Sequence, residues 1–66
     1  MKQSTLLALL RAYVRLQELA DDLYMASQEA LDNDNYDDAN LLQNRADKLY
    51  EEAENLDTLV REFDNL

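Results

Sequence analysis

The chain has 66 residues, of which 15 are acidic and 6 are basic, and its net charge is −9. It contains no Gly, Pro, Cys, His or Trp. This composition excludes a disulfide framework, zinc sites built on Cys and His, and nucleophiles activated by a His partner. It favours one domain, residues 1–66, made of long helices, because the strongest helix breakers are missing.

The first half of the sequence has the apolar spacing of one long helix. We expect it to begin after a cap at Ser4 or Thr5 and to cover about residues 5–31. Apolar or small residues recur at alternating intervals of three and four, which is the a and d spacing of a heptad. These seam positions are Leu6, Leu9, Tyr13, Leu16, Ala20, Leu23, Ser27 and Ala30.

Residues 32–35 read Asp-Asn-Asp-Asn and predict a turn, since Asx side chains bond to their own backbone and tolerate left-handed geometry. Asp34 or Asn35 is the expected cap of a second helix over about residues 36–64. That helix has an unbroken heptad seam in which small or β-branched residues alternate with large ones. Its members are Ala39, Leu42, Ala46, Leu49, Ala53, Leu56, Val60 and Phe63.

The two seams fit each other as an antiparallel pair. Positions that face each other across a hairpin share a constant sum of residue numbers, and every seam pair here sums to 69. Ala46 then faces Leu23, and Ala53 faces Leu16, so large side chains face small ones. The predicted fold is therefore all-α, an antiparallel helical hairpin. Two long helices leave their seams half covered, so we expect two hairpins to form a homodimeric four-helix bundle with Ala/Leu heptad layers.

One local string carries a resemblance to a known family. Ala46-Asp47-Lys48-Leu49-Tyr50 is similar to the Ala-Asp-Glu-Leu-Tyr of the second helix in Rop (Rom)-type helical-hairpin dimers, and Asp32 after Leu31 is similar to their turn. The resemblance implies a dimer of hairpins that binds paired RNA loops with the outward face of its first helix. The matching positions are Ser4, Leu7, Arg11, Arg15, Leu19 and Ala26, of which Arg11 and Arg15 are basic.

The end of the hairpin away from the turn is more apolar than its seam requires. Aliphatic residues occupy outer heptad positions there, close to two arginines, and such surfaces are typical of protein recognition. The candidate partner-binding residues are Leu7, Leu10, Arg11, Val14, Arg15, Leu59 and Leu66. The alternative interpretation is that these residues extend the dimer interface.

No catalytic, cofactor-binding or metal-binding residues are predicted. A calcium loop counted from Asp32 has Tyr36 at its fifth position, Asp37 at its sixth and Gln43 at its twelfth, where acid, Gly and Glu are needed. We therefore predict a non-enzymatic regulatory or adaptor protein of the cytoplasm, of the kind that phages and plasmids encode. Its partners would be a second copy of itself and another, unidentified protein.

Two alternative functions remain open at this point. One is a Rop-like RNA-binding regulator that uses Arg11 and Arg15, although the net charge makes general binding of nucleic acid unfavourable. The other is an inhibitor that imitates DNA with the acidic stripe of both helices. A membrane span is not expected, because no run approaches ~20 apolar residues.

Overall fold

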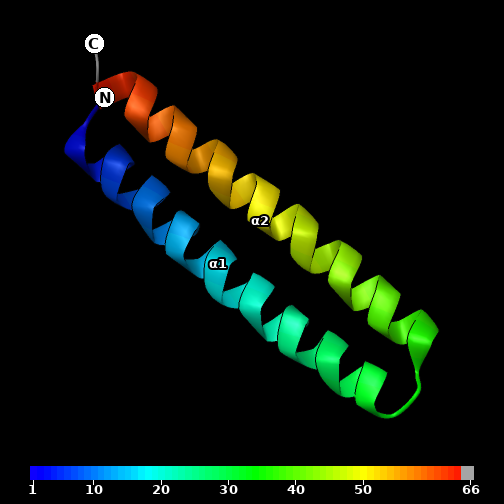
Figure 1. Cartoon of the computed structure of the whole chain (residues 1–66). Coiled ribbons are helices and arrows are strands. Elements are labelled where there is room, and N and C mark those ends of the chain that lie inside the picture. Colours follow the sequence, from blue (N-terminus) through cyan, green and yellow to red (C-terminus); the bar gives the residue numbers. More distant parts are fainter. Residues whose placement is uncertain (65–66) are drawn as a thin grey trace.

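The computed structural model describes residues 1–64, which form two antiparallel helices joined by a short turn (Figure 1). Helix α1 spans Gln3–Asp32 and helix α2 spans Tyr36–Asp64. The start of α1 and the end of α2 lie together at the end of the molecule opposite the turn. The prediction of an all-α helical hairpin is confirmed.

The a and d positions hold all of the most buried residues in the described part of the chain. These are Ala20, Ser27, Ala39, Ala46, Ala53 and Val60. The seam leucines are only half-buried, and no large side chain among the described residues is fully covered. Most small or β-branched members of the seam are thus buried, while its larger members remain partly accessible to solvent.

Phe63 departs from this pattern. We expected it in the core, but its side chain is 44% exposed. It belongs to the last turn of α2, and its expected neighbour Leu6 belongs to the first turns of α1, so little chain lies beyond the pair to cover the ring. Tyr13, the other aromatic residue of the seam, is half-buried in the middle part of α1.

The start of α1 also corrects an expectation. The helix begins at Gln3, and Lys2 occupies the N-cap position with extended backbone and no side-chain capping bond. Ser4 and Thr5 therefore lie inside the first turn and do not cap it. No acidic residue lies in that turn to interact with the helix dipole, whereas Asp37 and Asp38 lie in the first turn of α2.

The turn is stabilised by a Schellman motif, which explains why α1 ends where it does. Asp34 has a left-handed backbone with φ of 60°, a geometry that Asp and Asn accept more readily than other non-glycine residues. The Asn35 N–H donates to the Ala30 carbonyl over 2.8 Å, and the Asp34 N–H donates to the Leu31 carbonyl over 3.0 Å. The Asn33 side chain also donates to the Glu29 carbonyl. The carbonyls of Glu29, Ala30 and Leu31 near the end of α1 are thus satisfied without a glycine.

Side-chain contacts between the helices hold them in register. The Ser27 hydroxyl, which is buried, donates to the Ala39 carbonyl over 3.0 Å. The Tyr24 hydroxyl donates to the Asp47 carboxylate, and the Tyr24 and Tyr50 rings lie 6.1 Å apart at a tilt of 50°. Each of these contacts joins residues far apart in sequence, so a slip of one helix along the other would break all three.

The hairpin is a thin rod of 49 × 16 × 11 Å. Its radius of gyration is 15.1 Å, whereas a compact domain of this length would have roughly 11 Å. A rod one helix deep has no interior in which large apolar side chains can be enclosed. This shape is the reason why many apolar residues of both helices remain accessible.

Candidate functional site

A shallow, open groove of about 500 Å³ runs along the N-terminal half of α1. Its lining consists of Leu7, Leu10, Arg11, Val14 and Arg15. The three aliphatic side chains are 44%, 41% and 49% exposed, in chain order. We call this surface the α1 groove. It brings five of the seven predicted partner-binding residues together.

The heptad explains why these residues share one surface. Leu10 is at an e position beside the seam, and Leu7 and Val14 are at b positions further round the helix. Arg11 at f and Arg15 at c follow further round the helix in the same direction, away from Leu10. Residues three, four and seven apart lie on one side of a helix, so the aliphatic side chains form a stripe with the arginines at its outer edge.

Leu59 and Leu66 are not part of the α1 groove. Leu59 is 36% exposed, but it is at a g position of α2. In an antiparallel pair the e positions of both helices lie on one flank and the g positions on the other, so Leu59 lies across the hairpin from Leu10. Leu66 lies outside the described residues. We grouped both leucines with the α1 residues because they are near this end, but the g position of Leu59 in an antiparallel pair is the signal that separates it from Leu10.

The charges around the α1 groove are unbalanced. Residues 1–17 contain Lys2, Arg11 and Arg15 and no acid, while the other 49 residues carry a net charge of −12. Among the described residues, the one ion pair joins Arg61 to Asp57 within α2, and this contact raises the pKa of Arg61. Arg11 and Arg15 have no carboxylate within ion-pair distance in that part of the chain.

Tyr24 and Asp47 form a hydrogen-bonded pair that the sequence analysis did not predict. Hydrogen bonding to the Asp47 carboxylate, together with partial burial and the negative charge of that group, raises the pKa of Tyr24 to about 12. The phenol therefore stays protonated and acts as a donor. Tyr24 at an e position and Asp47 at a b position lie on the same flank, which is the signal that could have identified the pair.

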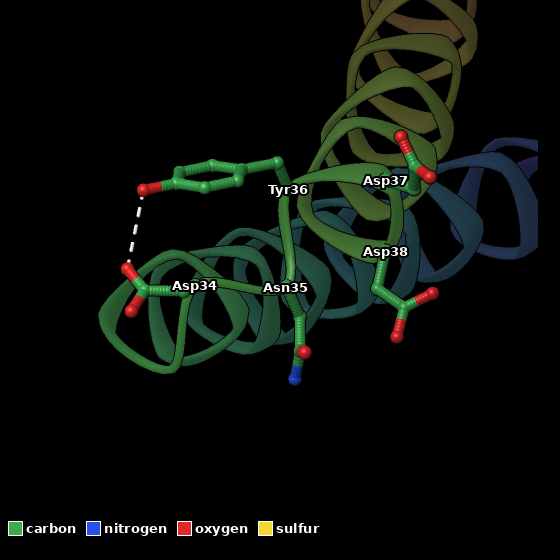
Figure 2. Close-up of a pocket in the computed structure, with 5 residues that line it drawn as sticks. All are labelled: Asp34, Asn35, Tyr36, Asp37 and Asp38. Carbon is green, nitrogen blue, oxygen red and sulfur yellow. Dashed lines mark hydrogen bonds between the residues drawn. The ribbon is translucent and has the colours of Figure 1, made fainter.

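A further hollow of about 390 Å³ lies at the turn, lined by Asp34, Asn35, Tyr36, Asp37 and Asp38. Figure 2 shows that the three carboxylates point in different directions. The Asp34 carboxylate accepts a hydrogen bond of 3.1 Å from the Tyr36 hydroxyl (Figure 2). These groups do not converge on a common point where a cation would bind. They serve the turn and the positive end of the α2 dipole.

Elsewhere, no group of three or more acidic side chains is arranged to hold a metal ion in the part of the chain that the structure describes. Over the same residues, neither helix has the length and apolar content that crossing a membrane requires. Comparison of the chain with family models, with curated proteins and with solved structures found no match.

Proposed function

We propose that this chain is a small acidic regulatory or adaptor protein of the cytoplasm, which acts by binding another protein and carries out no catalysis. The observation that supports this most directly is the α1 groove. Leu7, Leu10 and Val14 form a contiguous apolar stripe, and Arg11 and Arg15 rim it. Exposed stripes of this kind are rare on free proteins and common where proteins associate.

In this proposal the protein is a homodimer, in which two hairpins form a four-helix bundle. The half-covered seam supports this assembly. The hairpin exposes 5158 Å², whereas a compact monomer of its mass would expose roughly 4300 Å². The excess of roughly 800 Å² is about what each partner buries in a standard interface. Sedimentation should give the mass of a dimer, and a folded monomer at micromolar concentration would contradict the assembly.

The function is tested by capturing partners from the native host with three forms of the protein. These are the wild type, the Leu7→Ser/Val14→Ser variant and a control, Met25→Ser/Leu41→Ser. Met25 and Leu41 are 65% and 59% exposed and lie outside the α1 groove, so the control removes the same kind of surface elsewhere. We expect one protein to be retained by the wild type and by the control but lost by the groove variant.

Circular dichroism and sedimentation complete that test. The groove variant should keep its helicity and its mass, because its two substituted side chains are already exposed. Retention of the same protein by the groove variant would contradict the proposed function. A change in the mass distribution of the groove variant would show that the groove takes part in self-assembly.

A Rop-like RNA-binding regulator is the second candidate. It is favoured by the position of Arg11 and Arg15, which line the same groove one helical turn apart. This function requires binding to paired RNA loops that weakens steeply with salt and is lost in the Arg11→Ala/Arg15→Ala variant. Binding that is insensitive to salt, or unchanged in that variant, would exclude it.

A further inference from the structure

The α1 groove has the dimensions of a helix-binding site. Leu7 and Val14 are seven residues apart, which is about 10 Å along the axis of α1. Leu10 lies between them, so the stripe is two turns long and one side chain wide. A stripe of this form matches a partner helix with apolar residues at i, i+3 or i+4, and i+7, because rows of side chains on one helix pack into the grooves of another.

The charge of the groove indicates which charged side chains a partner helix would have next to its apolar residues. Arg11 and Arg15 are exposed, line the groove and have no ion-pair partner among the described residues. They are four residues apart, so they can meet two carboxylates that are likewise one turn apart. Arginine pairs with carboxylates through two parallel hydrogen bonds, which adds geometric selectivity to the attraction.

From this complementarity we infer that the α1 groove binds a short amphipathic helix of a partner protein, whose apolar stripe is flanked by Asp or Glu. The inference rests on the proposed function and specifies the chemistry of the partner. The occupant spans two to three turns, so it contacts the basic half of α1 and little else. At physiological salt, charges further away than about 8 Å are largely screened, so the acidic remainder of the chain repels it weakly.

Other occupants fit the charge distribution less well. An extended polyanion such as RNA or an anionic membrane would also approach the other 49 residues, whose net charge is −12. A second hairpin packed on the e flank would cover Leu10. It would leave Arg11 and Arg15 outside the contact, because f and c positions point away from a bundle interior.

Two stapled helical peptides test the inference directly. Both have leucines at i, i+3 and i+7 and a single tryptophan, which can be observed selectively because the chain has no Trp. One peptide has Glu at the positions that flank the stripe, and the other has Lys. We expect the Glu peptide to bind about tenfold more tightly at low salt, and the difference to shrink as salt is raised.

Variants then locate the binding. Arg11→Gln/Arg15→Gln should remove the preference for the Glu peptide. Arg45→Gln/Lys48→Gln, which removes the same charge from exposed positions of α2, should leave it unchanged. The Leu7→Ser/Val14→Ser variant should weaken binding of both peptides. Backbone amide shifts induced by the Glu peptide should be largest at residues 7–15.

The contrary results are distinct from failure of the proposed function. Equal binding of the two peptides, or tighter binding of the Lys peptide, would overturn the acidic partner while leaving the groove a docking site. If the amide shifts of the groove residues changed with protein concentration in the absence of peptide, the occupant of the groove would be a second copy of the chain. If the protein bound phosphatidylserine vesicles and Arg11→Gln/Arg15→Gln abolished that binding, the occupant of the groove would be an anionic membrane. Either of these results overturns the inference.

Discussion

The half of the hairpin near the turn differs from the half near the chain ends in how the two helices are joined. In the turn half, Tyr24 bonds to Asp47 and Ser27 bonds to Ala39, and both bonds cross from α1 to α2. Among the described residues, the other half has no such cross-helix bond and is joined by apolar contacts. Its surface in turn presents the α1 groove. The comparison teaches that register is set in one half, while the surface available to a partner lies in the other.

The largest expected difference between the halves comes from truncating large seam residues. Leu49→Ala removes a half-buried seam side chain that is expected to face Ala20, and it should cost about 2–5 kcal/mol. Phe63→Ala, in the last turn of α2, should cost about 1 kcal/mol or less because that ring is 44% exposed. Urea unfolding at fixed protein concentration measures both. Equal losses would mean that the two halves are equally well packed.

Enlarging a small seam residue should have the next largest effect. Ala46 is 0% exposed, so Ala46→Leu should overpack the turn half and cost about 1–3 kcal/mol or force a different packing. The matched control is Ala12→Leu, where the same change falls on an exposed position of α1 and should alter stability by less than about 0.5 kcal/mol. If Ala46→Leu melts like the wild type, the register with Leu23 is wrong.

Removing the buried hydroxyl of Ser27 should have a smaller effect. Ser27→Ala loses the hydrogen bond to the Ala39 carbonyl and should cost about 0.5–1.5 kcal/mol. Ser4→Ala, at an exposed position in the first turn of α1, provides the control and should be close to neutral. A neutral Ser27→Ala variant would show that apolar contacts hold the turn half as they hold the other half. Denaturant midpoints distinguish these outcomes.

The smallest expected effect is confined to alkaline pH. Because the pKa of Tyr24 is raised from 10.0 to about 12 in the fold, its hydrogen bond to Asp47 stabilises the protein fully below pH 10. This contribution should be lost as the pH rises from 10 to 12, when the phenol ionises. Tyr24→Phe should lack that part of the pH dependence, while Tyr36→Phe at the exposed turn should keep it. Unfolding midpoints across this range that are identical for wild type and Tyr24→Phe would contradict the assignment.

The sequence by itself determined the helices, the turn and the small-to-large alternation of the seam. These depend on local preferences and on a strict seven-residue period, both of which can be read along the chain. The same reasoning was less successful at the helix ends. There, Lys2 occupies the cap position expected for Ser4 or Thr5, because the start of a helix depends weakly on any one side chain.

Only the tertiary structure decided how far each outer side chain is covered and which side chains meet. It exposed Phe63 and brought Tyr24 to Asp47. These outcomes depend on the angle around the helix and on how far each side chain reaches across to its neighbour. For two antiparallel helices the heptad specifies that angle, but it does not specify how far a side chain reaches, so the reach had to come from the packing of α1 against α2.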